Sequence, residues 1–389
     1  NKLKWLSLPI SETGVIFAGL GCPNGCDFCC TSHFFKKAHI PLLKTGKDIF
    51  EAMKKYDGTL SGHSYAIIDE DFLKNKQRVE ELYKYTSKEL DTPRSFSCFA
   101  SANSIKQYDP EWLVELGVDS IWVGVESQLY QHQKIKDCNM KELFESLHKV
   151  GKNTLGSMIL GLDQHSNKNI WDDINYLISL NPTLSQFLIY SPCPTTPLWN
   201  RLDNEGKLIK DYPLQNRDGF HLLFKHDNFS AKEIEKLQME AFQKEFSELG
   251  PSVLRYVEKA FYGYRYFENK QKDVHIARKN VYRKLLASSL PLFGVVIRNA
   301  PSTKVRDWAI ELRKEVFSIL TLKEKFLGKT KSLIVPFFSA FTKFSLKHTT
   351  FHLQPKTMIT KHNFDLKKEE LDLSTPSNVC ETAQEVQIH

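Results

Sequence analysis

The sequence predicts an α/β protein that begins with a partial (β/α)6 barrel and continues into a mainly α-helical, basic C-terminal region. Six short runs rich in Val, Ile, Phe and Tyr recur at intervals of a few tens of residues, as buried parallel strands do. Stretches of helical periodicity separate these runs, and strict alternation of strand and helix favours a parallel sheet with right-handed crossovers. Because a complete barrel needs eight units, six units predict a partial one.

The predicted elements follow one another along the first half of the chain. The strands are expected at residues 13–19, 64–69, 95–100, 120–125, 155–160 and 186–191. The helices between them are expected at residues 48–56, 77–90, 111–116, 140–150 and 170–180. Asp109 and Pro110 supply a capping residue and a proline at the first helical position of the third helix. Further along, Ser230 and Glu233 form a capping box that opens a long helix to about residue 249.

Length and composition fit a globular protein with a substantial core. The chain has 389 residues, of which 41% are hydrophobic and 25% are charged. Its eight cysteines are too sparse for a secreted disulfide scaffold, so we expect a cytoplasmic protein. No run of 18 or more apolar residues predicts a membrane span. The chain opens at Asn1 in what resembles a loop, and we expect it to be the C-terminal part of a longer polypeptide.

Charge is distributed unevenly along the chain. Residues 251–350 hold 20 Lys and Arg against 7 Asp and Glu, whereas the whole chain has a net charge of only +7. The basic part therefore favours an anionic partner. The Phe-rich basic stretch at residues 332–346 is typical either of a helix lying on an anionic membrane or of a helix packed on the barrel. Nucleic acid is not expected, because no RNA-binding module is present. Residues 351–389 are polar and predicted to be disordered.

Three cysteines, Cys22, Cys26 and Cys29, follow the first predicted strand at the spacing C-x3-C-x2-C. Three thiolates at this spacing suit three irons of a [4Fe–4S] cube, which leaves the fourth iron open to another ligand. A zinc site and a disulfide are the alternatives. Zinc sites usually pair two Cys or His halves, and no second half is present here. In partial barrels chemistry lies at the carboxyl ends of the strands, which is where this motif begins.

The spacing, with Phe28 just before the last cysteine, resembles the signature of the radical S-adenosylmethionine (SAM) superfamily. The resemblance covers roughly residues 10–210 and implies a partial barrel fold. It implies that Cys22, Cys26 and Cys29 bind a [4Fe–4S] cluster whose open iron takes SAM. Reductive cleavage of SAM then gives a 5′-deoxyadenosyl radical that removes hydrogen from an unactivated C–H bond. A low-potential electron donor such as flavodoxin or ferredoxin is the implied partner.

The resemblance also implies which residues hold SAM. Phe28 and Glu126, the latter closing a Gly-Val-Glu-Ser strand end, orient the nucleoside. Ile159 and Gly161 match the segment that packs on the adenine, although core and turn roles are the alternative for both. Asp69 takes the place where the family binds the SAM amino group, and a solvated turn is the alternative there. The sequence does not identify which residues are catalytic.

Within the superfamily, the pattern is closest to the subgroup that carries a cobalamin-binding domain ahead of the cysteine motif. That subgroup implies cobalamin-dependent methyl transfer to an unactivated carbon of a small-molecule or lipid substrate. The alternatives are a methylthiotransferase or cyclase acting on RNA or a metabolite, and a non-enzymatic Fe–S or zinc-binding module. The predicted domains are residues 1–210 for the barrel, 211–350 for the helical basic region and 351–389 for the tail.

Overall fold

The structure, a computed structural model, describes residues 13–58, 63–129, 138–213, 216–328 and 330. All of these belong to one structural unit, Asn1–Ala340, and the second unit, Phe341–His389, lies wholly outside the described residues. The predicted membrane-binding stretch at 332–346 and the predicted tail at 351–389 therefore lie outside the described residues. The predicted domain boundaries at residues 210 and 350 stay predictions.

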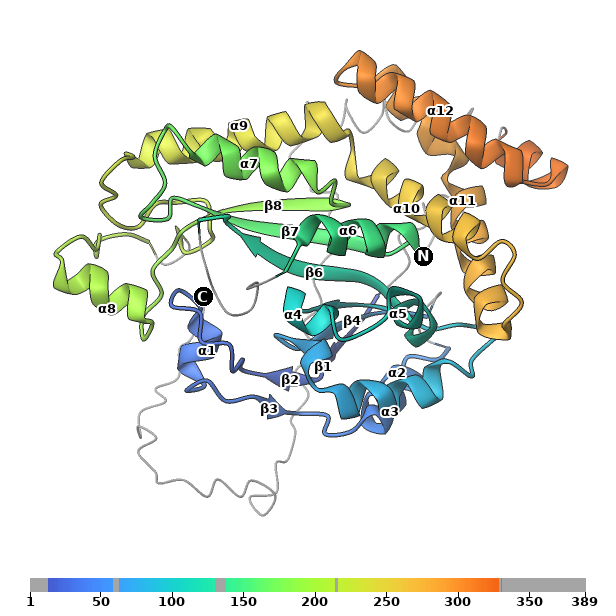
Figure 1. Cartoon of the computed structure of the whole chain (residues 1–389), viewed down its shortest axis with the longest axis horizontal. Coiled ribbons are helices and arrows are strands. Elements are labelled where there is room, and N and C mark those ends of the chain that lie inside the picture. The colour runs from blue at the N-terminus through green and yellow to red at the C-terminus, as the bar shows by residue number, and fades with distance from the viewer. Residues whose placement is uncertain (1–12, 59–62, 130–137, 214–215, 329, 331–389) are drawn as a thin grey trace, which may run out of the picture. The chain divides into compact units, whose positions relative to one another are not determined.

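A six-stranded, fully parallel sheet organises the first half of the chain, and it confirms the predicted fold class (Figure 1). In spatial order the strands are β1 (Gly14–Phe17), β4 (Ser64–Ile68), β5 (Ser95–Phe99), β6 (Val118–Glu126), β7 (Asn153–Leu160) and β8 (Leu184–Ile189). This order follows the chain, as expected for successive βα units. β1 and β8 are the two edge strands, so the sheet is open between them.

Helices between the strands cover one face of this sheet and build its core. They are α2 (Gly46–Lys54), α3 (Lys76–Thr86), α5 (Pro110–Leu116), α6 (Met140–Lys149) and α7 (Ile170–Ser179). The Asp109 side chain caps α5 ahead of Pro110, as predicted. Alternate strand residues point toward these helices and are fully buried, among them Ile67, Ile121 and Phe187. The remaining strand residues form the opposite face, which we call the open face.

Shorter elements lie around the ends of the strands. They are α1 (Cys30–Phe34), η1 (Phe72–Lys74), α4 (Ala102–Ile105), α8 (Pro197–Asn204) and the antiparallel pair β2 (Gly19–Leu20) and β3 (Ile40–Pro41). The β2–β3 pair was not predicted from the sequence. Its pairing brings Gly19 opposite Pro41 and so closes the base of the segment that carries the cysteine motif.

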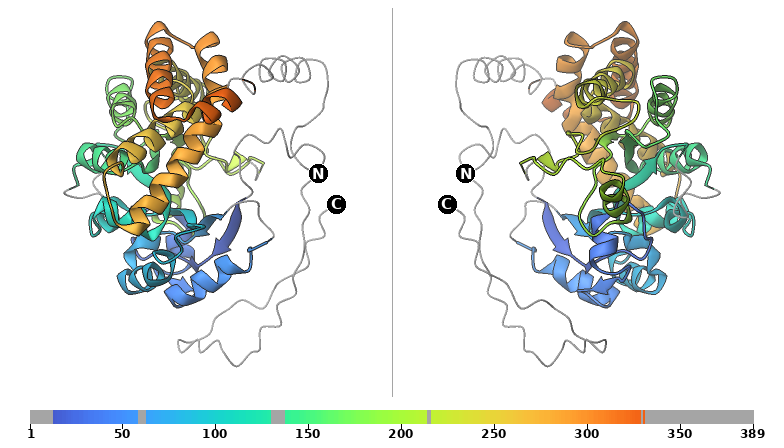
Figure 2. Two further views of the ribbon diagram at one scale, coloured as in Figure 1. Left: turned by 90° about the vertical axis from the view of Figure 1, so that its right-hand side faces the viewer. Right: turned by 90° about the vertical axis from the view of Figure 1, so that its left-hand side faces the viewer.

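Four long helices follow the sheet: α9 (Ala231–Leu249), α10 (Ser252–Tyr266), α11 (Asp273–Arg298) and α12 (Thr303–Ile319). The predicted Ser230–Glu233 capping box opens α9. Helices α10, α11 and α12 pack on one another around a second apolar core that includes Phe267, Leu286 and Phe293 (Figure 2). In Figure 1 they lie at the right, where β6 and β7 begin, and α1 and α8 lie at the left. Among the described helices, none is long and apolar enough to cross a membrane.

Candidate functional site

The cysteine motif lies between β2 and β3, at the carboxyl end of the sheet. Cys22 and Cys26 are buried, whereas Cys29 is half-buried, and all three are free thiols. Burial raises the pKa of Cys22 and of Cys29 above the usual thiol value. Reactive catalytic cysteines have a lowered pKa instead, so these thiols are typical of ligands that lose their protons when metal binds.

Hydrogen bonds to the backbone shape the loop around these thiols. Ser32 Oγ donates to the carbonyl of Cys22 at 2.6 Å and accepts from the amide of Gly25 at 3.0 Å. Nε2 of His33 lies 3.1 Å from the carbonyl oxygen of Cys26. Gly21 has a φ of +77°, and a Cβ atom there would lie 2.3 Å from the carbonyl oxygen of Ala38. Only glycine fits this position, because both its φ and the close backbone approach exclude a side chain.

Hydrogen bonds attach the loop to the ends of two separate strands of the sheet, β4 and β8. Asn24 Nδ2 donates to Oδ2 of Asp71, which follows β4, at 3.0 Å. On the other side, the hydroxyl of Tyr190, just after β8, donates to Asp27 Oδ2 at 3.2 Å. The amide of Leu198 in α8 donates to the carbonyl of Asp27 at 3.2 Å. The cysteine loop therefore reaches from the β4 end to the β8 end of the sheet.

Zinc holds thiolates at about 2.3 Å in a tetrahedron, so its ligand atoms lie roughly 4 Å apart. In the described part of the chain, the group that brings three potential ligand atoms within 4.8 Å of one another is Glu111, Glu115 and His275, and not the cysteine motif. The three thiols are therefore not gathered as the ligands of one zinc ion would be.

Three carboxylates follow β4, and each has different partners. Oδ2 of Asp69 accepts from Arg78 Nη2 at 2.6 Å and lies 3.1 Å from Nε2 of His39. Asp71 accepts from the amide and the hydroxyl of Ser101, both at 2.9 Å. Asp69 and Asp71 are therefore buried parts of the scaffold.

Glu70 lies between these two aspartates, and its side chain is turned toward the cysteine motif. Its carboxylate is hydrogen-bonded to Thr31 and interacts electrostatically with Cys29 and Cys30. It is exposed, unlike its two neighbours. Of the three carboxylates, Glu70 is the one that faces the cysteine loop.

Glu126 ends β6 in an unusual backbone conformation. The strand register shifts between Gly124 and Glu126, which marks a bulge, and φ of Glu126 is +62°. A left-handed φ costs a non-glycine residue about 1–3 kcal/mol, and such outliers gather at functional sites. The residue is buried, with 5% of its surface exposed.

A buried network connects the end of β6 with the end of β7. His165 Nδ1 accepts from the amides of Gly161 and Leu162, both at 3.1 Å. Its Nε2 must therefore carry the proton, and it donates to Asp173 Oδ2 at 2.9 Å. Ser127, next to Glu126, donates to the same oxygen. Gly161 has a φ of +79°, and this network fixes its turn.

The other predicted nucleoside contacts lie on the same side of the sheet. The ring of Phe28 meets Tyr190 edge-on with centroids 6.0 Å apart. Ile159 is 6% exposed at the end of β7. Cys193 is half-buried, and its thiol is hydrogen-bonded to that of Cys30 beside the cysteine motif.

The open face of the sheet carries apolar and aromatic side chains near the edge that holds the cysteine loop. Val15 and Phe17 in β1 are 48% and 58% exposed. Phe99 in β5 stacks on Trp122 in β6, with ring centroids 4.8 Å apart. The strand register pairs these two residues directly. The open face therefore presents apolar surface next to the cysteine end of the sheet.

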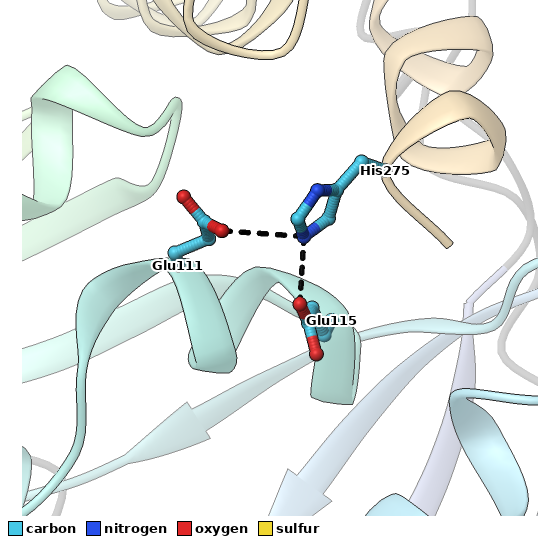
Figure 3. A group of neighbouring side chains, drawn as sticks. All are labelled: Glu111, Glu115 and His275. Atoms are coloured by element: carbon cyan, nitrogen blue, oxygen red, sulfur yellow. Dashed lines mark hydrogen bonds and ion pairs between the residues drawn. The ribbon is translucent and has the colours of Figure 1, made fainter. Parts of the chain in front are cut away.

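Glu111, Glu115 and His275 form a second group of potential ligands, far along the chain from the motif (Figure 3). The two glutamates stand on α5 and the histidine on α11. Nε2 of His275 lies 2.6 Å from Oε1 of Glu115 and 3.4 Å from Oε1 of Glu111.

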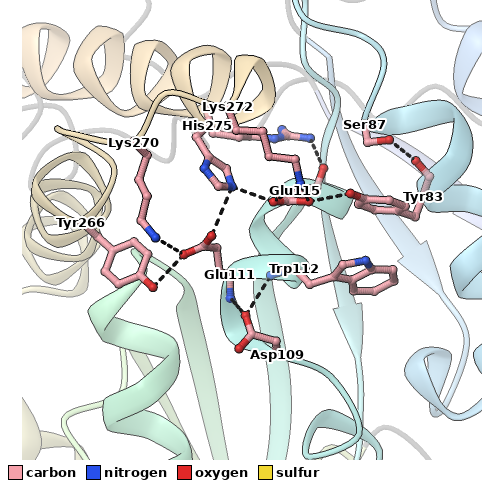
Figure 4. Close-up of polar contacts among 11 residues, drawn as sticks. Tyr83, Ser87, Asp109, Glu111, Trp112, Glu115, Tyr266, Lys270, Lys272 and His275 are labelled. Carbon is pink, nitrogen blue, oxygen red and sulfur yellow. Dashed lines mark hydrogen bonds and ion pairs between the residues drawn. The ribbon is translucent and has the colours of Figure 1, made fainter.

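Two lysines already balance the charge of these glutamates (Figure 4). Lys272 Nζ donates to both oxygens of Glu115 at 2.7 Å, and Lys270 Nζ donates to Glu111 Oε2 at 2.8 Å. Although burial opposes ionisation, the bonds from Lys272, Tyr83 and His275 lower the pKa of Glu115. A cation would have to displace both ammonium groups, so we interpret this group as a link that holds α5 against α11.

No protein-family model matches the chain. In sequence it is similar to the hopanoid C-2 methylase of Rhodopseudomonas palustris, with 26% identity over 229 residues, covering 56% of this chain and 42% of the relative. It is also similar to an uncharacterised methyltransferase of Pyrococcus horikoshii, with 24% identity over 253 residues, covering 62% of this chain and 52% of the relative. The chain thus spans about half the length of the curated relatives it matches.

Two solved structures give further matches. One is the radical S-adenosylmethionine methyltransferase TsrM from Kitasatospora setae with cobalamin and a [4Fe–4S] cluster bound, at a TM-score of 0.43 and 13% identity, covering 71% of this chain and 61% of that chain. The other is the cobalamin-dependent SAM radical enzyme OxsB with aqua-cobalamin and SAM bound, at a TM-score of 0.41 and 16% identity, covering 86% and 55%. The two curated relatives are named as a methylase and a methyltransferase, which agrees with the methyltransferase part of the predicted resemblance.

The structure brings most of the predicted site residues to one edge of the sheet. Cys22, Cys26, Cys29 and Phe28 lie on the loop that crosses this edge, and Glu126, Ile159 and Gly161 lie at the ends of β6 and β7. Asp69 is at the same edge, but its carboxylate faces Arg78 and His39. The binding roles of these residues in a radical SAM site stay predictions.

Sequence reasoning missed Glu70 and His165 as residues of this edge. Glu70 is one of three successive acidic side chains, and the sequence holds no signal that separates it from its neighbours. His165 follows the Gly161 strand end by four residues, and that spacing was the available signal.

Proposed function

We propose that this chain is the cluster- and SAM-binding part of a radical SAM methyltransferase that acts on an unactivated carbon of a lipid-like substrate. The observation that carries the proposal is the meeting of three features at one edge of a parallel sheet. They are the three-cysteine loop, the strained Glu126 and the Gly161 turn. Carboxyl ends of parallel strands are where such folds place their chemistry.

In this proposal Cys22, Cys26 and Cys29 hold three irons of a [4Fe–4S] cluster, which when bound supplies the electron for reductive cleavage of SAM. The chain itself binds and orients the nucleoside. Glu126 accepts hydrogen bonds from the ribose hydroxyls, and its left-handed backbone aims the carboxylate out of line with the strand. Ile159 and the Gly161 turn contact the adenine, and the burial of the surrounding strand ends excludes water.

We assign the contact with the SAM amino group to Glu70 and not to Asp69. A carboxylate that receives a cationic group has to have an oxygen available on the side of the cysteine loop, and Glu70 is exposed on that side. Oδ2 of Asp69 is already paired with Arg78 at 2.6 Å, and its Oδ1 has no hydrogen-bond partner but is buried, so a second cation would have to reach a buried atom beside a guanidinium. Asp69 instead positions the start of the cysteine loop, since a Cβ on Gly19 would lie 2.5 Å from its Oδ2.

The substrate class rests on the open face of the sheet. Exposed Val15 and Phe17 and the Phe99–Trp122 stack suit a hydrocarbon surface better than a polar one. One relative is named as a methylase of hopanoids, which are lipids. Cobalamin would come from a domain outside the described residues, and the electron from a flavodoxin or ferredoxin. Contact with an anionic membrane through the basic C-terminal region would give access to such a substrate.

Anaerobic cluster reconstitution followed by a 5′-deoxyadenosine assay with SAM and a strong reductant tests the proposal. We expect about four irons per chain and production of 5′-deoxyadenosine that is lost in Cys26→Ala. Cys30→Ala is the matched control, because it removes a thiol from the same segment outside the motif, and it should keep both iron and activity. Iron binding without 5′-deoxyadenosine would leave a non-enzymatic Fe–S module. Equal losses in both variants would contradict the assigned ligand set.

A second pair of variants separates the two β4 carboxylates. Glu70→Gln should weaken SAM binding about tenfold, as expected for loss of one charge-assisted contact worth about 1.5 kcal/mol. Asp69→Asn should instead lower thermal stability, since it leaves Arg78 buried without a charge partner. Weaker SAM binding in Asp69→Asn at unchanged stability would return the role to Asp69.

The methylthiotransferase alternative predicts a compact C-terminal β-barrel for RNA. In the described part of residues 230–330, the regular elements are helices α9 to α12. This observation favours methyl transfer over the alternative.

A further inference from the structure

A cavity of about 680 Å³ lies at the amino ends of the strands, at the opposite edge of the sheet from the cysteine loop. Its floor includes Ser64, Ser95, Asn153 and Leu184, which are the first residues of four strands. Helices α10 and α11 form its other wall. Ligand pockets commonly enclose about 300–1,000 Å³, so the volume suits a small molecule.

The wall that the helices contribute is apolar. Val257 and Ala260 on α10 and Val281 and Leu285 on α11 line it. Two further lining residues are well exposed, Val253 at 45% and Leu184 at 42%. Val257 and Ala260 are buried, so the apolar surface that a ligand would cover is mainly that of Val253 and Leu184, and covering it gains about 25 cal/mol for each Å².

Asp119 supplies a polar end to this apolar cavity. It lies near the start of β6, and its Oδ2 accepts from the hydroxyl of Tyr256 on α10 at 2.9 Å. The buried side chains of Lys152 and Arg278 lie close enough to interact electrostatically with Asp119. Serine and threonine side chains also line the cavity, but Asp119 is a carboxylate acceptor beside its aliphatic wall and can orient a ligand that carries a donor.

The surrounding charges restrict what that donor can be. An anionic head group would be repelled by Asp119, and Asp91 also lines the cavity. A cationic head group would meet Lys284 at the cavity wall and the buried charges of Lys152 and Arg278. A neutral hydroxyl avoids both costs and still donates to the carboxylate.

We propose that this cavity binds the hydrocarbon part of an amphipathic alcohol whose hydroxyl donates a hydrogen bond to Asp119. The site is separate from the cysteine edge, and it does not depend on the proposed methyltransferase activity. Its ligand is a long-chain or polycyclic alcohol, because the aliphatic walls from α10 and α11 need a hydrocarbon of matching extent.

The test uses the full chain without cofactors, so that its outcome is independent of cluster loading. N-phenyl-1-naphthylamine is a neutral apolar dye whose fluorescence rises on binding, and 1-dodecanol should displace it from the protein. Val281→Trp places a large ring in the cavity and should weaken binding of 1-dodecanol at least tenfold. Val295→Trp is the matched control, since Val295 lies on the same helix but does not line the cavity. The affinity of Val295→Trp for 1-dodecanol should stay within twofold of that of the wild-type protein.

A second arm tests the polar end. Asp119→Asn keeps the shape of the side chain but removes its charge, and should weaken binding of 1-dodecanol about fivefold. Dodecyl methyl ether lacks the hydroxyl, and its affinity should not change in this variant. An absence of displacement by 1-dodecanol, or equal losses in Val281→Trp and Val295→Trp, would overturn the proposal. Equal losses for the alcohol and the ether in Asp119→Asn would overturn the role given to Asp119. Displacement of the dye only at protein concentrations that also dimerise the chain would identify a second copy as the occupant.

Discussion

Replacing Asp173 by Asn tests whether the buried network behind the Gly161 turn holds the nucleoside edge together. The carboxylate of Asp173 accepts three hydrogen bonds. His165 Nε2 and Ser127 Oγ donate to Oδ2, and the amide of Gln128 donates to Oδ1 at 3.0 Å. An Asn side chain has one acceptor oxygen, so its NH2 group must face at least one of these donors.

The expected loss of stability follows from the number of hydrogen bonds that Asp173 accepts. A hydrogen bond to a charged group contributes about 1.5–3 kcal/mol, and a buried donor left without a partner costs about 1–3 kcal/mol. We therefore expect Asp173→Asn to lower the free energy of unfolding by about 3 kcal/mol. Because the chain has 389 residues, each kcal/mol shifts the unfolding midpoint by only about 2 °C, which predicts a fall of about 6 °C.

Thermal unfolding followed by circular dichroism measures this effect, and Asp172→Asn is the matched control. Asp172 is the preceding residue in the first turn of α7, but its side chain is exposed. Its replacement should change stability by no more than about 0.5 kcal/mol. If the two variants unfold at the same temperature, the reasoning about the network is wrong.

The pH dependence of the Asp173→Asn effect provides a further check. Burial opposes ionisation of Asp173, but hydrogen bonds from His165, Ser127 and Gln128 outweigh it and hold its pKa below the ordinary value of 3.8. A carboxyl with a lowered folded pKa contributes its full stability above its unfolded pKa, and this contribution is lost as pH falls through the folded pKa. The difference between wild type and Asp173→Asn should therefore be constant near pH 7 and shrink below about pH 4. A difference that grows in acid would contradict the assignment.

Three further predictions concern other residues of the two described edges. Thr195 is exposed and has a φ of +74°, so Thr195→Gly should raise the free energy of unfolding by about 1 kcal/mol in denaturant titrations. Its neighbour Thr196 caps α8 by accepting from the amide of Trp199, so Thr196→Gly should lower the free energy of unfolding by about 1 kcal/mol. Glu115→Gln should lower the free energy of unfolding by about 3 kcal/mol at pH 7. Because the pKa of Glu115 is lowered, this loss should shrink as pH falls through that pKa. Glu111 is half-exposed, so Glu111→Gln, measured in the same way, should cost less. Glu126→Gln should weaken SAM binding to the reconstituted protein about tenfold in equilibrium dialysis, and unchanged SAM binding would remove Glu126 from the site.

Local patterns in the sequence were sufficient to predict the framework. Apolar runs of strand length located all six strands of the main sheet to within two or three residues, since each buries one face against helices whose own periodicity is regular. Capping residues set the starts of α5 and α9, because a side chain that binds a free backbone amide acts only within one turn. The cysteine motif was found because its ligands lie within eight residues.

Contacts between distant residues could not be predicted in this way. Ser127 and Asp173 are 46 positions apart, and Asn24 and Asp71 are 47 apart, yet each pair is joined by a direct hydrogen bond. No periodicity encodes such pairs, because they depend on which strand ends become neighbours after the sheet forms. The same holds for the β4 carboxylates. Asp69 contacts Arg78 and His39, whereas Glu70 contacts Thr31 beside the cysteine motif, and their positions in the sequence do not distinguish these partners.

Backbone strain is concentrated at the edge that carries the cysteine loop. Within the described residues, five non-glycine positions have a left-handed φ. Lys36 and Lys37 follow the cysteine motif, Glu126 is the last residue of β6, and Thr195 lies in the segment that follows β8. Of the five, only Asn181 lies at the opposite edge, before β8. Each such residue costs about 1–3 kcal/mol and persists only where its surroundings fix it. At Glu126 the Ser127–Asp173–His165 network supplies that constraint. If the network's purpose is to hold Glu126 in place, Asp173→Asn should weaken SAM binding as well as stability, and a loss of stability alone would show that it serves only the fold.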